Sequence, residues 1–210
     1  MLSGQRFAWP SLNALFADRV KNMPNKTFLA FPKAGATNNP SAFAYDEYTF
    51  GQVDDMVSHL AASYAVALPP RRVNQPSIAV GLFASSGFDY IVHSLALFRL
   101  GHVVVYLSTN NSTAALAHLV KVTSITTLLY SFDKAEAISA LKPMLEEQGL
   151  ASVDLVRWTS VSEALKLSLA TTMDSRRYTT ELSYDQESLE DAFVIHSSGS
   201  TGFPKPNFLK

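Results

Sequence analysis

The spacing of apolar residues follows two periods along this chain. Near the N-terminus, helical spacing before Pro24 predicts a first helix on Leu12, Leu15, Phe16 and Val20. Two strands are expected over 27–31 and 44–50, and a largely apolar face from Val53 to Tyr64 predicts a second helix.

From residue 77 onward, short apolar runs alternate with helical segments. The predicted strands cover 77–83, 103–107, 126–130, 152–156 and 193–196, and the predicted helices cover 89–100, 114–122, 134–148 and 161–169. Pro143 should kink or split the helix over 134–148, and the polar segment 171–190 is expected on the surface. Continuous apolar strands joined by helices favour an α/β fold, with a mainly parallel sheet and flanking helices.

The densest candidate chemistry lies near the end of the chain, which reads His196-Ser197-Ser198-Gly199-Ser200-Thr201-Gly202-Phe203-Pro204-Lys205. Glycines let backbone N–H groups approach a ligand and form an anion-binding nest. The hydroxyls add donors that rotate to suit phosphate oxygens, and the lysine supplies a mobile positive charge. These residue types favour polyphosphate binding, with ATP as the expected ligand.

The spacing of this run excludes a Walker A loop, in which lysine directly follows the second glycine and a helix begins. Here two prolines flank Lys205 and disfavour a helix. The sequence therefore predicts strand, loop, strand, with a second strand over 207–209. The alternative is an ordinary polar surface loop, and the fixed proline and lysine after an apolar strand argue against it.

Composition removes several classes of function. The 210 residues carry a net charge of −1 without a broad basic patch, so nucleic acid is not an expected partner. The absence of cysteine excludes thiolate metal sites, and the five histidines show no metal-binding spacing, so no metal ligand is assigned. Charged residues interrupt the apolar stretch 78–107, so no membrane span is expected. Ser85-Ser86-Gly87 is expected to form a turn and helix N-cap.

The run from Ser197 to Lys205 fits the pattern S/T-S/G-G-S/T-S/T-G-x-P-K at each fixed position. It resembles the phosphate loop of the adenylate-forming (AMP-binding) superfamily, which includes acyl-CoA synthetases, luciferases and adenylation domains of nonribosomal peptide synthetases. Tyr48–Val53 and Leu100–Leu107 are similar to two scaffold motifs of the same superfamily. His196 and Pro206 resemble the fungal synthetase-like carboxylic acid reductases.

The resemblance implies that a carboxylate attacks the α-phosphate of ATP and gives acyl-adenylate and pyrophosphate. Lys205 would be the catalytic cation that neutralises the departing pyrophosphate. The β- and γ-phosphates would be held by Ser197, Ser198, Gly199, Ser200, Thr201 and Gly202. Two roles stay open for His196, which either lines the mouth of the acyl pocket or caps the buried strand.

By the same resemblance, the adenine, ribose and Mg²⁺ ligands and a C-terminal catalytic lysine lie downstream of the phosphate loop. Residues 1–210 are then expected to be a partial adenylation domain, inactive alone, with Phe193–Ile195 lacking a neighbouring strand. The expected partners are downstream carrier and reductase domains, with phosphopantetheine on the carrier, in a cytoplasmic protein. The alternatives are a fragment of an acyl-CoA synthetase and a non-catalytic truncated nucleotide-binding protein.

Overall fold

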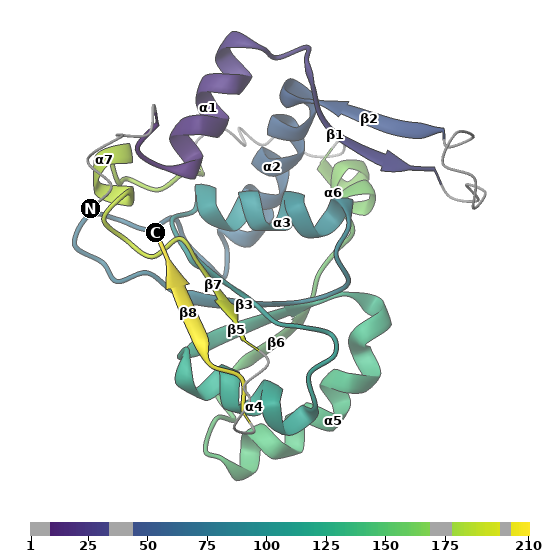
Figure 1. The fold of residues 1–210 in the computed structure, drawn as a ribbon, viewed down its shortest axis with the longest axis vertical. Coiled ribbons are helices and arrows are strands. Elements are labelled where there is room, and N and C mark those ends of the chain that lie inside the picture. The colour runs from purple at the N-terminus through teal and green to yellow at the C-terminus, as the bar shows by residue number, and fades with distance from the viewer. Residues whose placement is uncertain (1–8, 34–43, 169–177, 198–202) are drawn as a thin grey trace.

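Helices and strands alternate along most of the chain (Figure 1). The computed structural model describes residues 9–33, 44–168, 178–197 and 203–210. The helices are α1 (Leu12–Asn22), α2 (Phe50–Tyr64), α3 (Phe88–Arg99), α4 (Thr113–Val122), α5 (Ala135–Glu147), α6 (Val161–Ser168) and α7 (Tyr184–Glu187), with a 3₁₀ turn η2 (Phe132–Lys134) before α5. The strands are β1 (Thr27–Pro32), β2 (Tyr45–Thr49), β3 (Ala79–Phe83), β4 (Val103–Tyr106), β5 (Ile125–Tyr130), β6 (Asp154–Arg157), β7 (Phe193–His196) and β8 (Pro206–Leu209).

Six strands form the central sheet, in the order β6-β5-β3-β4-β7-β8. Neighbouring strands are parallel from β6 to β7, and only β7 and β8 pair antiparallel. β1 and β2 form a separate antiparallel pair. The prediction of an α/β fold with a mainly parallel sheet and flanking helices is confirmed.

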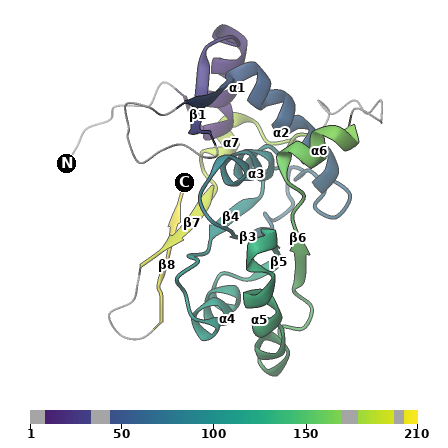
Figure 2. The ribbon, with the colours of Figure 1, turned by 90° about the vertical axis from the view of Figure 1, so that its right-hand side faces the viewer.

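Helices cover both faces of the sheet, as the two views in Figures 1 and 2 show. α4 and α5 lie on one face, and α3 lies on the other with α1, α2 and α6 behind it. In β4, Val103 and Val105 pack in one cluster with the leucines of α4 and α5, whereas Val104 packs with Leu97 of α3. Because both faces of the strand are buried, its sequence is continuously apolar.

The motif Tyr48–Val53 spans the end of β2 and the start of α2. The Thr49 side chain accepts a hydrogen bond from the Gln52 amide at 3.3 Å, and the Gln52 side chain accepts one from the Thr49 amide at 2.9 Å. This reciprocal capping box satisfies two amide donors that a helix start otherwise leaves free. The motif therefore has a scaffold role.

Pro143 lies inside α5 without splitting it, because Pro143 and Ser139 face solvent. Water can bind the Ser139 carbonyl that proline leaves free, while buried Leu141 and Leu145 hold the opposite face. Of the two expected outcomes, a kinked helix or a split one, the split is therefore ruled out.

The start of α3 follows the sequence expectation in part. Its N-cap is Gly87, the last residue of the run Ser85-Ser86-Gly87. Because glycine has no side chain, no side-chain hydrogen bond caps this helix, and Ser85 and Ser86 lie before the cap.

The expectation that Phe193–Ile195 would lack a neighbouring strand was wrong. β7 pairs with β4 on one side and along its whole length with β8 on the other. Only four residues, Pro206–Leu209, are needed to complete this pairing. The two edge strands of the sheet are therefore β6 and β8.

Candidate functional site

The loops that leave the carboxyl ends of β3, β4, β5, β6 and β7 lie along one edge of the sheet, because these strands are parallel. We call this the carboxyl edge. Open α/β sheets bind ligands outside the carboxyl ends of their strands. The predicted phosphate loop (Ser197–Lys205) leaves β7 at this edge, so the sequence motif and the topology indicate the same place.

The first and last residues of the predicted phosphate loop, Ser197 and Lys205, are joined by a backbone hydrogen bond, and we call this pair the closed neck of the loop. β7 and β8 pair up to His196 opposite Pro206, and the Ser197 amide then donates to the Lys205 carbonyl at 3.1 Å. This confirms the expected strand–loop–strand arrangement in place of a strand followed by a helix. Ser198–Gly202, which include most of the predicted phosphate ligands, lie outside the described residues.

The start of the predicted phosphate loop contacts the segment between β4 and α4. The Ser108 amide donates to Nε2 of His196 at 3.2 Å, and the Asn111 side-chain nitrogen lies 3.2 Å from the same atom. Nδ1 of His196 lies 3.4 Å from the Ser197 carbonyl oxygen. The His196 side chain is half-buried.

The end of the predicted phosphate loop contacts α4. The Phe203 ring stacks on His118, with centroids 4.8 Å apart and planes inclined by 25°. The next residue, Pro204, is buried. The β4–α4 unit therefore contacts the loop on both sides of its neck, which fixes where the loop begins and ends.

Lys205 and Ser197 are exposed at the neck. Among the described residues, no carboxylate lies within 4.0 Å of the Lys205 ammonium group. An unpaired cation beside a closed loop can bind an anionic ligand without first breaking an ion pair.

Ser108, Asn111 and His118 were missed by sequence reasoning. The available signal was the polar run Ser108–Ser112 directly after an apolar strand, which in a parallel sheet falls at the carboxyl edge. The helical period of α4 would have placed His118 on that helix without indicating the partner of its ring.

A second polar cluster is buried between the helices α2 and α3 and the segment that follows β6. The Tyr64 hydroxyl lies 2.6 Å from Nδ1 of His93, and the His93 ring stacks on Trp158 with centroids 4.4 Å apart. Burial lowers the pKa of His93 to about 3 and raises the pKa of Tyr64 above its ordinary value. Burial also raises the pKa of Asp89. This cluster is neutral at His93 and Tyr64, and it joins α2 and α3 to the segment after β6.

Two further searches cover the described ranges 9–33, 44–168, 178–197 and 203–210. No group of three or more histidine, aspartate or glutamate side chains is arranged to hold a metal ion there. None of the helices in those ranges is long and apolar enough to cross a membrane.

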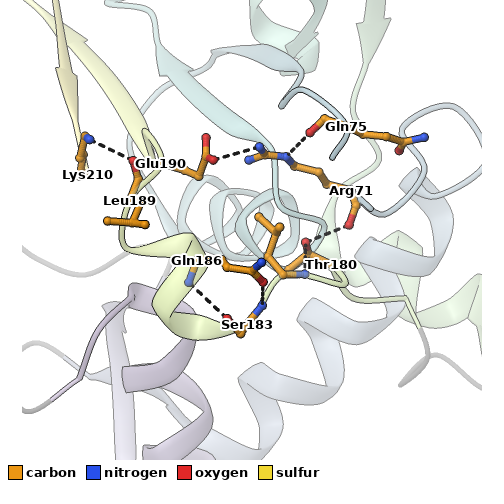
Figure 3. Close-up of polar contacts among 9 residues, drawn as sticks. Arg71, Gln75, Thr180, Ser183, Gln186, Leu189, Glu190 and Lys210 are labelled. Carbon is orange, nitrogen blue, oxygen red and sulfur yellow. Dashed lines mark hydrogen bonds and ion pairs between the residues drawn. The ribbon is translucent and has the colours of Figure 1, made fainter. Parts of the chain in front are cut away.

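The opposite, amino edge of the sheet is closed by the segment 178–192, which we call the strap. The Thr180 hydroxyl and the Glu181 amide donate to the Arg71 carbonyl at 3.0 and 2.9 Å, and the Arg71 guanidinium binds Glu190 at 3.2 Å (Figure 3). Arg71 is buried, and its Nε also donates to the Gln75 carbonyl at 2.8 Å.

Most of the described part of 171–190 is exposed or half-buried, as expected of a surface segment, and the exception is Thr180. Thr180 is buried against Gly101, and Lys210 donates to the Leu189 carbonyl at 2.9 Å (Figure 3). A cavity of about 270 Å³ lies between the strap and residues 9–15. Buried Arg71 and His102 line this cavity beside mainly apolar side chains.

Comparison with known proteins gives a consistent result. A carboxylic acid reductase of Neurospora crassa is 21% identical over 192 residues, which cover 91% of this chain and 17% of that protein. The chain therefore spans only a small part of the length of the curated relatives it matches.

Two solved structures share the fold. The N-terminal domain of FACL13 from Mycobacterium tuberculosis matches with a TM-score of 0.66 at 18% identity, over 94% of this chain and 43% of that one. ATP-bound MatB from Rhodopseudomonas palustris matches with a TM-score of 0.62 at 17% identity, over 94% of this chain and 34% of that one.

A family model described as AMP-binding enzyme matches residues 16–210, nearly the whole chain, and it includes β7, the closed neck and β8. The parallel sheet and the strand–loop–strand at its carboxyl edge agree with this match. The chain belongs to the AMP-binding enzyme family.

Proposed function

We propose that residues 1–210 are the N-terminal part of an adenylation domain that, in the full-length protein, activates a carboxylic acid as an acyl-adenylate. The observation that carries the proposal is the closed neck, with unpaired Lys205 at the carboxyl edge of the sheet. The family match over 16–210 supports the reaction class.

In the proposed reaction, a carboxylate oxygen attacks the α-phosphorus of ATP. A carboxyl–phosphate bond forms, the bond between the α- and β-phosphates breaks, and pyrophosphate leaves with the bond electrons. Ser197, Ser198, Ser200, Thr201 and the amides of Gly199 and Gly202 would hold the β- and γ-phosphates. Lys205 would neutralise the charge that develops on pyrophosphate, which is catalysis by positioning and electrostatics.

Mg²⁺ does not fit the donors described at the neck, because they are an amide, a hydroxyl and a cation. Mg²⁺ prefers carboxylate and phosphate oxygens in an octahedral arrangement. The proposed chemistry of this chain therefore concerns the phosphate groups alone.

The proposed acceptor of the acyl group is a phosphopantetheine thiol on a downstream carrier domain, followed by a reductase domain. The similarity to the carboxylic acid reductase of Neurospora crassa supports this over transfer to free coenzyme A. Coenzyme A remains the second candidate, because a fatty acyl CoA synthetase of Mycobacterium tuberculosis shares the fold. Thioester formation on the carrier domain but not on coenzyme A distinguishes the two.

The test is ATP–pyrophosphate exchange by the full-length protein with a panel of aryl and amino acids. We expect acid-dependent exchange by the full-length protein and none by residues 1–210, because the phosphate loop alone does not hold adenine and ribose. No exchange by the full-length protein with any acid would support the non-catalytic alternative. Exchange by residues 1–210 would show that the catalytic set is complete in this chain.

A further inference from the structure

His196 is held in a defined chemical state by the segment between β4 and α4. A backbone amide and an Asn side-chain nitrogen can only donate hydrogen bonds. The Ser108 amide and the Asn111 side-chain nitrogen both lie 3.2 Å from Nε2 of His196, so this ring nitrogen must accept. In the neutral ring the proton is then on Nδ1.

The protonated nitrogen faces the predicted phosphate loop. Nδ1 of His196 lies 3.4 Å from the Ser197 carbonyl, the first carbonyl after β7. The Ser197 amide is at the same time committed to the Lys205 carbonyl across the neck. The tautomer of His196 and the orientation of the first loop peptide are therefore coupled.

The two donors have different origins. Ser108 contributes its backbone amide, which no side-chain substitution removes, whereas Asn111 contributes a side chain. The next residue, Ser112, caps α4 by accepting from the Ala115 amide at 3.2 Å. The backbone that carries Asn111 therefore leads directly into a capped helix.

We propose that Asn111 is a positioning residue of the phosphate loop. Together with the Ser108 amide, it keeps His196 in the Nδ1–H tautomer, and His196 in turn orients the Ser197 carbonyl at the start of the loop. This inference rests on the proposed function, because it assumes that the oriented loop binds the phosphates of ATP.

The first experiment reads the tautomer directly by nitrogen NMR of the imidazole rings in the 210-residue chain, with His196→Gln used to assign the signal. We expect a pyridine-type Nε2 and a pyrrole-type Nδ1 at His196 in the unmodified chain. Asn111→Asp replaces a neutral donor by a charged acceptor of the same shape. A charge-assisted bond from Nε2–H to the carboxylate is stronger than the neutral bond from the Ser108 amide, so Nε2 should become pyrrole-type. Asn110→Asp is the matched control, because it adds the same charge at the exposed neighbouring residue and should leave Nε2 pyridine-type.

The second experiment measures ATP–pyrophosphate exchange by the full-length protein. Asn111→Asp should raise the KM for ATP about 3- to 10-fold, as expected for one lost hydrogen bond, with the KM for the acid unchanged. Asn110→Asp should leave both constants unchanged. A general loss of folded protein would instead lower kcat and leave both KM values as they were.

Substitution of His196 provides a rescue test. Gln places its carbonyl oxygen near the position of Nε2, so His196→Gln keeps an acceptor for Ser108 and Asn111. Asn is too short to reach that position. The KM for ATP should therefore rise less in His196→Gln than in His196→Asn.

An unchanged pyridine-type Nε2 in Asn111→Asp would overturn the inference, as would a KM for ATP that is equal in Asn111→Asp and Asn110→Asp. Because the tautomer is read without substrate, this outcome is distinct from failure of the proposed function. The latter would appear as absence of exchange in the unmodified full-length protein.

Discussion

Arg71 and Lys205 are cations at opposite edges of the same sheet, and their surroundings differ. Arg71 is 9% exposed, binds Glu190 and donates to the Gln75 carbonyl. Lys205 is exposed, and no carboxylate among the described residues pairs with it. The first cation has its partners within the fold, whereas the second is free for a ligand.

The two edges also differ in how they are closed. The strap covers the amino edge through hydrogen bonds to the Arg71 and Arg99 carbonyls. At the carboxyl edge, the segment between β4 and α4 and the helix α4 contact the predicted phosphate loop at His196 and Phe203. We infer that the amino edge serves stability and the carboxyl edge serves binding, so substitutions at the two should affect different measurements.

The largest effect is expected at Lys205. Lys205→Ala in the full-length protein should slow ATP–pyrophosphate exchange roughly 30- to 1,000-fold, because a charge that stabilises the transition state is lost. The melting temperature should hardly change, since no ion pair within the described residues is broken. Lys142→Ala removes an exposed lysine from α5 and should change neither quantity. Unchanged exchange in Lys205→Ala would remove Lys205 from the mechanism.

Gly101 provides the next test, at the amino edge. Its φ of +81° favours glycine, and an added Cβ would lie 2.7 Å from the Thr180 hydroxyl and 3.0 Å from Cβ of Arg71. Gly101→Ala should therefore lower the free energy of unfolding by about 2–5 kcal/mol, from backbone strain and overpacking together.

Gly149 is the matched control for Gly101. Its φ is +73°, but no atom lies within 4 Å of an added Cβ. Gly149→Ala should cost only the backbone strain, about 1–2 kcal/mol. Urea unfolding measures both variants, and equal losses would mean that the strap does not pack against Gly101 in solution.

The adjacent residues Arg71 and Arg72 allow the loss of a buried cation to be compared with the loss of an exposed one. Arg71→Ala should lower the free energy of unfolding by about 1–3 kcal/mol, because it leaves Glu190 and the Gln75 carbonyl without a partner. The Arg72 side chain is 71% exposed and lies 3.8 Å from Glu181, so Arg72→Ala should cost less than about 0.5 kcal/mol. A larger loss at Arg72 would contradict the view that the strap is held at Arg71.

The smallest effect near neutrality is the dependence of stability on pH. Burial lowers the pKa of His93 to about 3 and also lowers the pKa of His102. The unfolded chain therefore binds more protons than the folded chain below about pH 6.5, the ordinary value for histidine. The part of the unfolding free energy that depends on neutral His93 and His102 should be fully present above that pH. It should be lost as the pH falls toward 3.

Urea unfolding between pH 7 and pH 4 measures this dependence. The slope of the unfolding free energy against pH is proportional to the number of protons taken up on unfolding. Replacing His93 with Gln should reduce that number by about one. A slope that does not change would mean that His93 titrates in the folded protein as it does in the unfolded chain.

The strands were predictable from sequence because the signal of their burial lies within each strand's own residues. Val103–Val105 are covered on both faces, and that alone produces a continuous apolar run. The strand–loop–strand was predictable for the same reason, since the prolines beside Lys205 exclude a helix whatever the surroundings.

The strap and the contacts around His196 were not predictable. Thr180 is buried through a carbonyl 109 residues earlier, and a polar residue with a distant partner looks like any surface residue in the sequence. Asn111 meets His196 across 85 residues, and nothing in the local pattern indicates that pairing. The roles assigned to Ser198–Gly202 stay a prediction, because those residues lie outside the described ranges.

The position of β7 in the sheet has a consequence for synthesis on the ribosome. β4 is made early, but the strand that covers its outer side is β7, whose Phe193 pairs with Val104. At about 5–20 residues per second, the gap of about ninety residues takes roughly 5–20 s. During that interval the backbone groups on one side of Val103–Tyr106 have no partner strand, and they are open to pairing with another nascent chain. Slower translation between β4 and β7 should therefore increase aggregation during synthesis.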